Sequence, residues 1–358
     1  RQQNPADFNL PAGAGNWAFG FQGVDSSGDP LAGDGAYTED SSGNFSGVED
    51  INDYGTHLQS TLSGGHVTSS IDSNGRVTSQ VQLSGIGTSN LVHYIISANE
   101  TVGIRIDSAE PMFAESNLRQ SGTFNLGSLN GTAIGRGSRV AHPGSGAESE
   151  ALVELIGGGG NGNVSFTEDI NSGGTVVTDV QEFGTYTVAS NGRAVVTLTT
   201  GAEIVCYVIT TNQGFCINAI PASGNNVHGA ELTYFEPQVV PPGGSFSDAS
   251  FSGEYLGGSL PQYLSSTLSQ VDSNVSSGAA TFSSTYTWSG PSGTMLNQTL
   301  TGTYNVTPAT GAIAISVEGN PLYAGYIVSP NEVEYITAGT GSNPLTLIEV
   351  TSSAPRHH

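Results

Sequence analysis

Two acidic segments hold the residues of this chain that are best suited to bind a cation. They carry carboxylate and amide oxygens at Glu49, Asp50, Asn52 and Asp53 and, in a second copy further along, at Glu168, Asp169 and Asn171. Hard oxygen ligands at alternate positions suit Ca²⁺, which is the one cofactor that the sequence suggests. Both segments lack the glycine and the terminal glutamate of a helix-flanked calcium loop. Asp and Asn side chains that cap a turn between strands are therefore the alternative interpretation.

The residues that usually perform catalysis are not arranged for it. The chain has no Gly-x-Ser-x-Gly elbow, and its histidines before the last two residues are widely separated, without metal-ligand spacing. A glycoside hydrolase needs two carboxylates at a fixed distance and usually aromatic platforms for sugar rings, whereas this chain has only Trp17 and Trp288. Glycoside hydrolysis is the weakest of the functions that we consider, and we expect no catalytic residue and no enzyme.

Two cysteines flank a turn signal. Cys206 and Cys216 lie on either side of residues 211–214, between two apolar runs, so they can face each other across a hairpin. We expect a disulfide formed in an oxidising compartment, and two buried free thiols are the alternative.

The charge of the chain excludes several functions. The net charge is −23, and all eight positive side chains are arginines. Eight scattered arginines cannot neutralise a nucleic-acid backbone, and without lysine neither a P-loop nor a Schiff base can form. The chain begins at Arg1 and has no apolar run long enough to cross a bilayer. We therefore expect a processed, exported protein, with neither a nucleic-acid partner nor a membrane span.

Seven Asn-x-Ser/Thr sequons occur, a number close to that expected by chance from the many Asn, Ser and Thr residues. On a secreted surface they are candidate N-glycosylation sites. They lie at Asn44, Asn99, Asn130, Asn163, Asn274, Asn297 and Asn305.

Self-similarity is the strongest pattern in the sequence. The first acidic segment recurs 119 positions later, and Ser-Asn-Gly-Arg at 73–76 recurs at 190–193. An apolar strand centred on Tyr94 recurs around Tyr207 and again around Tyr326. The third copy is more diverged and lacks the acidic segment. The repeats predict three β domains, at residues 16–119, 120–236 and 250–350.

Short runs of alternating apolar and polar residues, rich in β-branched types and separated by Asn-Gly, Ser-Gly and Gly-Gly turns, fill each repeat. This pattern predicts an all-β protein of three tandem antiparallel meanders with about 7–8 strands each and no substantial helix. Periodicity does not separate barrels from sandwiches, although short sequential hairpins favour barrels. If the barrels are filled, we expect Phe19, Phe21, Tyr94 and Tyr207 to point inward.

Three segments lie outside the repeats. Residues 237–249 form a linker rich in Pro and Gly, and residues 351–358 form a C-terminal tail. The N-terminal extension, residues 1–15, contains Asp7, Phe8, Asn9 and Leu10, which could form one short strand. Such a strand could pair with an exposed sheet edge of the next copy of the chain.

The opening Gly-aromatic strand, the acidic segment, the Ser-Asn-Gly-Arg turn and the Tyr-Ile-Ile/Val strand resemble the repeats of secreted tandem-repeat β-proteins of acidobacteria-type environmental bacteria. The resemblance covers the first two repeats well and the third loosely. It implies export from a bacterial cell and β architecture, and suggests a subunit of an extracellular fibril. It implies no catalytic residue.

Two classes of function follow as hypotheses. The first is a structural subunit of an extracellular filament or surface assembly, which polymerises head-to-tail with other copies of itself through the terminal strand. The second is a secreted binding module that holds a small apolar ligand in a lipocalin-like barrel or a glycan on its loops.

Overall fold

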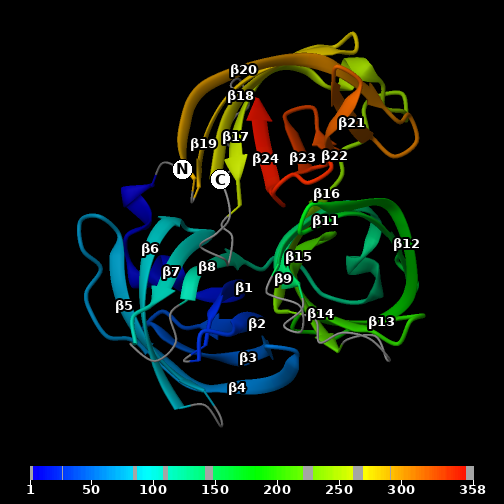
Figure 1. Cartoon of the computed structure of the whole chain (residues 1–358). Coiled ribbons are helices and arrows are strands. Elements are labelled where there is room, and N and C mark those ends of the chain that lie inside the picture. Colours follow the sequence, from blue (N-terminus) through cyan, green and yellow to red (C-terminus); the bar gives the residue numbers. More distant parts are fainter. Residues whose placement is uncertain are drawn as a thin grey trace.

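The chain folds into three closed antiparallel barrels of eight strands each, as a computed structural model shows (Figure 1). The structure describes residues 3–25, 27–83, 87–107, 112–141, 148–220, 229–260, 269–290 and 292–351. The prediction of three tandem meander barrels is confirmed. Each strand pairs with its sequence neighbours, and the last strand of each barrel pairs with the first.

Barrel 1 encloses an aromatic interior because alternate side chains of a strand point to opposite faces. Trp17, Phe19 and Phe21 occupy the inward positions of its first strand, as predicted for the two phenylalanines. Its strands are β1 (Gly15–Val24), β2 (Pro30–Glu39), β3 (Asn44–Asp53), β4 (Thr56–Val67), β5 (Arg76–Leu83), β6 (Gly87–Ser97), β7 (Glu100–Arg105) and β8 (Met112–Arg119).

Barrel 2 is filled by apolar side chains, among them the predicted disulfide. Cys206 and Cys216 are directly opposite residues of adjacent strands and are joined within the barrel core. The strands are β9 (Asn130–Ala141), β10 (Glu148–Gly159), β11 (Asn163–Ser172), β12 (Thr175–Val188), β13 (Arg193–Leu198), β14 (Glu203–Thr210), β15 (Gln213–Ile220) and β16 (Glu231–Pro237).

Barrel 3 has the most aromatic core, which includes Phe251, Tyr255, Tyr304 and Tyr335. Its strands are β17 (Ser252–Ser259), β18 (Ser269–Ser277), β19 (Thr281–Gly290), β20 (Gly293–Val306), β21 (Ala312–Val317), β22 (Asn320–Ser329), β23 (Glu332–Thr337) and β24 (Thr346–Thr351). Apart from Thr351, the predicted C-terminal tail lies outside the described residues.

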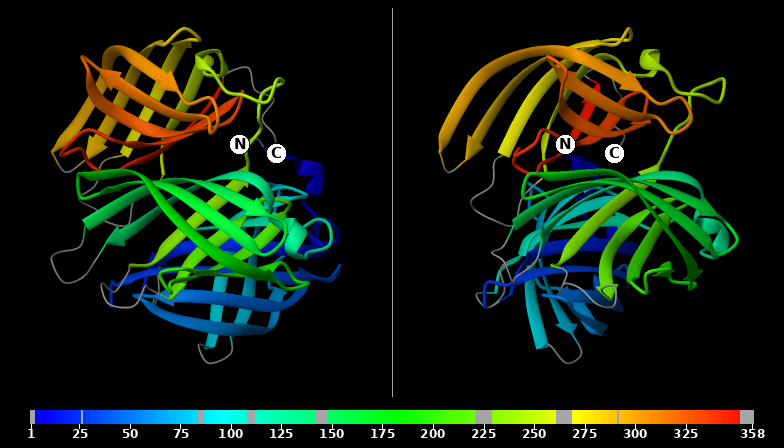
Figure 2. Two further views of the ribbon diagram at one scale, coloured as in Figure 1. Left: turned by 90° about the vertical axis from the view of Figure 1, so that its right-hand side faces the viewer. Right: turned by 45° about the vertical axis from the view of Figure 1, so that its right-hand side comes forward.

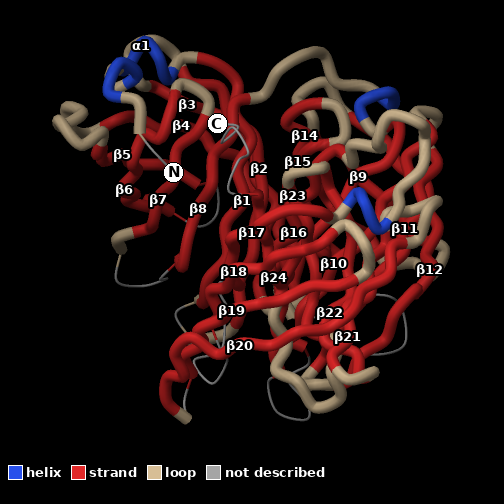
Figure 3. The backbone as a smooth tube through the Cα atoms, turned by 90° about the horizontal axis from the view of Figure 1, so that it is seen from above, coloured by secondary structure: helices blue, strands red, loops and turns tan. Residues whose placement is uncertain are grey.

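In the residues that the structure describes, helices are single turns, drawn in blue in Figure 3. They are η1 (Pro5–Asp7), α1 (Leu10–Gly13), η2 (Leu126–Ser128) and η3 (Asp248–Ser250). None of the helices in the described part of the chain is long and apolar enough to span a bilayer.

The N-terminal segment is not the predicted strand. Asp7, Phe8, Asn9 and Leu10 lie in and between η1 and α1, and two asparagines explain why. The Asn4 and Asn9 side chains accept hydrogen bonds from the amides of Ala6 (3.3 Å) and Ala12 (3.0 Å), which caps both turns. A proline at the start of each turn supplies the helical φ angle. The segment is therefore folded onto barrel 1.

Each barrel is preceded by a glutamine that fixes the incoming chain. The side-chain amide of this residue donates hydrogen bonds to two carbonyl oxygens of the barrel that follows. The donors and acceptors are Gln3 to Asn74 and Ile95 (2.9 and 2.8 Å), Gln120 to Asn191 and Val208 (3.1 and 2.7 Å), and Gln238 to Thr310 and Ile327 (2.8 and 2.9 Å). The segments before the barrels are therefore equivalent parts of one repeated unit. The predicted linker at 237–249 contains Gln238 and is the copy of this segment that precedes barrel 3.

A tyrosine fastens the short helical turn to the interior of barrels 2 and 3. The Tyr186 hydroxyl donates hydrogen bonds to the carbonyl oxygens of Leu126 (2.7 Å) and Leu129 (2.8 Å). Tyr304 binds the carbonyls of Asp248 and Phe251 in the same way, at 3.0 and 2.9 Å. The equivalent position in barrel 1 is Val67. In each barrel the backbone amide of this residue donates a hydrogen bond to the turn between the second and third strands of that barrel.

Candidate functional site

The barrels meet through two outer surfaces, which recur at both junctions. We call the outer surface of the first three strands of a barrel its front face, and that of the last three strands its back face. The front face of barrel 1 (β1–β3) packs on the back face of barrel 2 (β14–β16), and the front face of barrel 2 packs on the back face of barrel 3 (β22–β24). The barrels thus follow one another stepwise, from blue through green to orange in Figure 2.

Junction 1, between barrels 1 and 2, has an apolar centre. Small side chains of the front face, including Ala18, Ala32 and Ala36, allow Tyr207 and Ile217 of the back face to approach closely. All five residues are buried. The pattern is that of a permanent interface, in which an apolar core excludes water.

An ion pair borders this apolar centre. Asp50 is fully buried, and its carboxylate accepts hydrogen bonds from Arg193 (2.7 and 2.8 Å) and from the hydroxyl of Tyr207 (2.7 Å). His57 Nε2 lies 2.8 Å from Asp50 Oδ1. Burial alone would raise the pKa of Asp50, but the hydrogen bonds from Arg193, His57 and Tyr207 outweigh it and hold the pKa well below its usual value. Asp50 is therefore a charged connector between two barrels.

Junction 2, between barrels 2 and 3, uses larger aliphatic side chains. Ile134, Ala151 and Val153 of the front face pack against Tyr326 and Ile336 of the back face. These five residues are also buried. Junctions 1 and 2 thus bury the same two kinds of back-face residue, a tyrosine and an isoleucine.

Equivalent asparagines show that the two junctions share one geometry. Asn52 Nδ2 donates to the carbonyl of Asn218 (2.6 Å), and Asn171 Nδ2 donates to the carbonyl of Thr337 (2.8 Å). The donor and acceptor are 166 residues apart in both cases. A single docking mode therefore operates twice along the chain.

The back face of barrel 1 carries the same two residues without a partner barrel. Tyr94 and Ile104 each precede their barrel 2 counterparts, Tyr207 and Ile217, by 113 positions. The counterparts are 0 and 1% exposed, whereas Tyr94 is 41% and Ile104 is 46% exposed. Tyr94 and Tyr207 both point outward, which corrects the expectation that they fill the barrels. They lie on the outer faces because each directly follows a residue that points inward, His93 or Cys206, and successive side chains of a strand point to opposite sides.

The front face of barrel 3 shows the matching excess of exposed apolar residues. Leu256 follows the fastened residue Phe251 by five positions, as Ile134 follows Leu129. Val271 pairs with Gly258, two residues after Leu256 on β17. Val153 likewise pairs with Arg136, two residues after Ile134 on β9. Ile134 and Val153 are fully buried, whereas Leu256 is 47% and Val271 is 60% exposed.

The predicted calcium ligands are not brought together. Successive residues of β3 point to opposite sides of the strand, so Glu49 and Asp53 face the interior of barrel 1 while Asp50 and Asn52 face junction 1. The segment lies within a strand and not in the turn that we expected. Ligands on opposite faces of one sheet cannot bind a single ion.

The second acidic segment is divided in the same manner. Asn171 belongs to junction 2, and Asp169 accepts the backbone amide of Asp179 (2.9 Å). Glu168 lies on the inner side of β11, where burial and the nearby charge of Glu182 raise its pKa to about 8. In neither copy do the predicted ligands converge on one point.

Among the described residues, one group of carboxylates is close enough to share an ion. Glu236, Glu332 and Glu334 meet at junction 2. The guanidinium of Arg136 is placed among them, with Nη1 2.8 Å from Glu236 and in direct contact with Glu334. The group is therefore paired with an arginine and forms a second polar connector between barrels.

Six of the seven sequon asparagines are exposed and agree with a site on the surface. Asn274 is the exception. It is 1% exposed inside barrel 3, where its amide donates to the hydroxyl of Tyr335 (2.9 Å) and contacts Glu349. A side chain in that place is out of reach of any glycosylating enzyme in the folded protein.

The docking faces were missed by sequence reasoning, although a signal existed. The tyrosine of the recurring strand keeps its place in all three repeats, while the residues beside it change between His93, Cys206 and Gly325. A constant residue beside variable interior ones indicates a constraint outside the barrel, namely the neighbouring barrel.

No family model matches the chain, and no curated protein matches it. Among solved structures, kievitone hydratase from Nectria haematococca is similar over 66% of this chain and 92% of its own, with 6% identity and a TM-score of 0.27. An AttH-type protein from Nitrosomonas europaea is similar over 98% of this chain and 97% of its own, with 9% identity and a TM-score of 0.19. Likenesses of this strength carry no argument about function.

Proposed function

We propose that this protein is a structural subunit of an extracellular assembly, in which the front face of barrel 3 docks on the back face of barrel 1 of the next copy. The observation that carries the proposal is the pair of equivalent junctions inside the chain. Each end of the chain has the unused half of the same docking mode. A second copy of the chain is therefore the partner that offers the complementary half of this docking mode.

The apolar residues at the two ends support this docking. In junction 2, Ile134 and Val153 share one apolar cluster with Tyr326 and Ile336. Between two copies, Leu256 and Val271 would take the places of Ile134 and Val153, and Tyr94 and Ile104 those of Tyr326 and Ile336. All four exposed residues would become buried, and hydrophobic burial is the main favourable term in association.

A head-to-tail contact of this kind joins two different surfaces, so it forms fibres unless the rotation closes a ring. Within one chain no ring forms, since the described front face of barrel 3 and back face of barrel 1 both remain exposed. In Figure 1 barrel 2 lies beside barrel 1, whereas barrel 3 lies above both, so the second step runs in a different direction from the first. Repetition of this turning step from copy to copy would give a helically winding array.

This mode of assembly differs from the predicted pairing of a terminal strand with the next copy of the chain. Residues Asn4 and Asp7 bind the chain's own barrel 1, where the Asn4 amide donates to the carbonyl of Ile96 (3.0 Å) and Asp7 accepts the amide of Ala98 (2.9 Å). The N-terminal segment is thus engaged within its own subunit. In the proposed assembly, the front face of barrel 3 in one copy contacts the back face of barrel 1 in the next copy.

An extracellular location accords with the disulfide between Cys206 and Cys216, since such bonds persist in oxidising compartments. The net charge of −23 opposes association at low ionic strength. Salt screens this repulsion, so we expect assembly to strengthen as ionic strength rises towards physiological values.

Substitution of the two faces tests the proposal. We expect wild-type protein to form fibres in negative-stain electron microscopy, and Ile104→Arg and Leu256→Arg each to remain monomeric by light scattering. An unpaired charge in an apolar interface should weaken docking at least about tenfold. Phe183→Arg is the matched control, because Phe183 is 54% exposed on β12, which belongs to neither face.

Mixing the two blocked variants gives the sharper result. Ile104→Arg retains an intact front face on barrel 3, and Leu256→Arg retains an intact back face on barrel 1. An equimolar mixture should therefore form dimers and nothing larger. Fibres from either single variant, or wild-type protein that stays monomeric across concentration and salt, would show that the proposed docking is wrong.

A further inference from the structure

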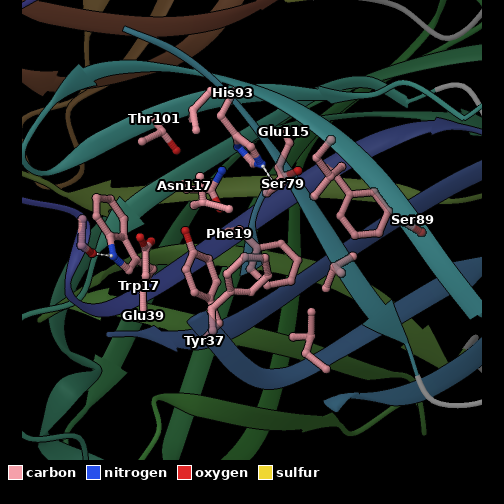
Figure 4. A pocket seen from close by; sticks show the side chains of 18 of the residues that line it. Trp17, Phe19, Tyr37, Glu39, Ser79, Ser89, His93, Thr101, Glu115 and Asn117 are labelled. Atoms are coloured by element: carbon pink, nitrogen blue, oxygen red, sulfur yellow. Dashed lines mark hydrogen bonds between the residues drawn. The ribbon is translucent and has the colours of Figure 1, made fainter. Parts of the chain in front are cut away.

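Barrel 1 encloses a cavity in its interior. The cavity measures about 220 Å³. Three aromatic side chains, Trp17, Phe19 and Tyr37, form one side of it, and polar side chains that include His93 and Asn117 face them (Figure 4). Trp17 and Tyr37 are stacked, with ring centroids 6.3 Å apart.

One substitution between the repeats explains the open space. Tyr186 and Tyr304 reach across the ends of barrels 2 and 3 to bind the carbonyls of the helical turn. Barrel 1 has Val67 at the same position, and Val67 lines the cavity together with Leu10 of the turn. Barrel 1 thus lacks the phenol ring and hydroxyl that barrels 2 and 3 have at this position.

An unsatisfied amide inside the cavity points to a ligand. Asn117 is fully buried, yet neither its Oδ1 nor its Nδ2 has a hydrogen-bond partner among the described residues. Buried polar groups without a partner are rare, because each loses the hydrogen bonds that it would make with water. The Ser89 hydroxyl, which also lines the cavity, is buried without a partner as well.

The walls specify the chemical class of the ligand. An aromatic wall suits a flat ring. The side-chain carbonyl of Asn117 can accept a hydrogen bond from an N–H or O–H group on that ring. Carboxylates of Glu39, Glu49 and Glu115 line the same space, so an anion would be repelled. Burial raises the pKa of Glu39 to about 7.

We propose that barrel 1 binds a small, uncharged aromatic molecule that carries one N–H or O–H donor, with its ring on the aromatic wall and its donor on Asn117. The size follows from the volume. A cavity of ~150 Å³ accepts benzene, so one of about 220 Å³ accepts roughly nine or ten non-hydrogen atoms. The proposal is independent of assembly, since every residue involved lies inside the barrel.

Indole and indene provide a matched pair of probes, since they have the same shape and differ in the N–H donor. Calorimetric titration of the full chain should show one site per chain, with indole bound roughly 3- to 10-fold more tightly than indene, the value of one net hydrogen bond. The side-chain amide signal of Asn117 in an NMR spectrum should shift with indole. Failure of both probes to bind would overturn the proposal.

Two variants separate the donor contact from the cavity itself. Asn117→Leu should keep the binding of indene and remove the preference for indole. Val67→Tyr, which copies the residue of the other two barrels, should fill the space and abolish binding of both probes while the far-UV spectrum stays unchanged. An unchanged preference in Asn117→Leu, or unchanged affinity in a folded Val67→Tyr, would contradict the assigned site.

Discussion

The hydroxyl of Tyr207 in barrel 2 donates a hydrogen bond to the buried carboxylate of Asp50 in barrel 1, at 2.7 Å. Its counterpart Tyr326 crosses junction 2 in the same direction and donates to the carbonyl of Thr167 (3.2 Å). The tyrosine keeps its task although its acceptor changes from a charge to a backbone group. The two junctions therefore share their geometry and differ in their electrostatics.

Asp50→Asn is expected to destabilise junction 1. The substitution removes the charge that Arg193 faces, and breaking a buried ion pair on one side costs about 3–5 kcal/mol. Thermal unfolding should occur earlier, and hydrogen exchange should quicken in β3 and β14. Asp40→Asn is the control, since Asp40 is exposed and caps a turn through Oδ1, which asparagine retains. Equal effects of the two substitutions would contradict a special role for the ion pair.

Asp34→Val is expected to stabilise the protein. Asp34 is fully buried at junction 1, and neither carboxylate oxygen has a hydrogen-bond partner among the described residues, while barrel 2 has Val153 at this position. Relief of an unsatisfied polar group should add about 1–3 kcal/mol to the free energy of unfolding in urea titrations. Asp34→Asn keeps a polar group in place and should gain much less. A loss of stability in the valine variant would refute the assignment.

Replacing both cysteines by alanine is expected to lower the stability of barrel 2. The disulfide closes a loop between residues 10 positions apart, and the chain-entropy model assigns about 2–3 kcal/mol to a loop of this size. Chemical unfolding measured with and without a reductant provides the test. The reductant should destabilise the wild type and leave the double variant unchanged. A wild type that is indifferent to reduction would show that the bond contributes nothing.

The stability of the protein is expected to fall as the pH rises from about 5 to 8. Burial first, and then the charge of Glu182, raise the pKa of Glu168 from 4.5 to about 8. The folded state therefore holds a proton that the unfolded state releases above pH 4.5, so unfolding becomes easier with rising pH until the folded-state pKa is passed. Glu168→Gln should flatten the dependence of the urea midpoint on pH, while the exposed Glu254→Gln should not. Parallel curves for wild type and Glu168→Gln would contradict this.

The number of barrels and their strand order could be predicted from the sequence, because turn residues and alternation act locally. Residues 73–76 and 190–193 form the same turn in both barrels, and the strand around Tyr207 lies where its recurrence predicted. The pairing of Cys206 with Cys216 was equally local, since a hairpin places them opposite each other.

What faces a neighbouring barrel could not be predicted in this way. Alternation reveals that Asp50 and Asn52 share one side of a strand and leaves open whether that side meets water, a ligand or another domain. Their partners, Arg193 and Asn218, lie more than 140 residues away. The prediction of a strand in the N-terminal segment was wrong for the opposite reason. Its asparagine caps and prolines act within four residues and override its β propensity.

The glutamines that anchor each incoming segment also mark where one structural module ends and the next begins. Gln3, Gln120 and Gln238 each bind the barrel that follows, so a segment of DNA copied from one glutamine codon to the next encodes a closed barrel with its own fastening and both docking faces. Duplication or loss of such a segment changes the length of the molecule by whole modules, and every module arrives already fitted to its neighbours.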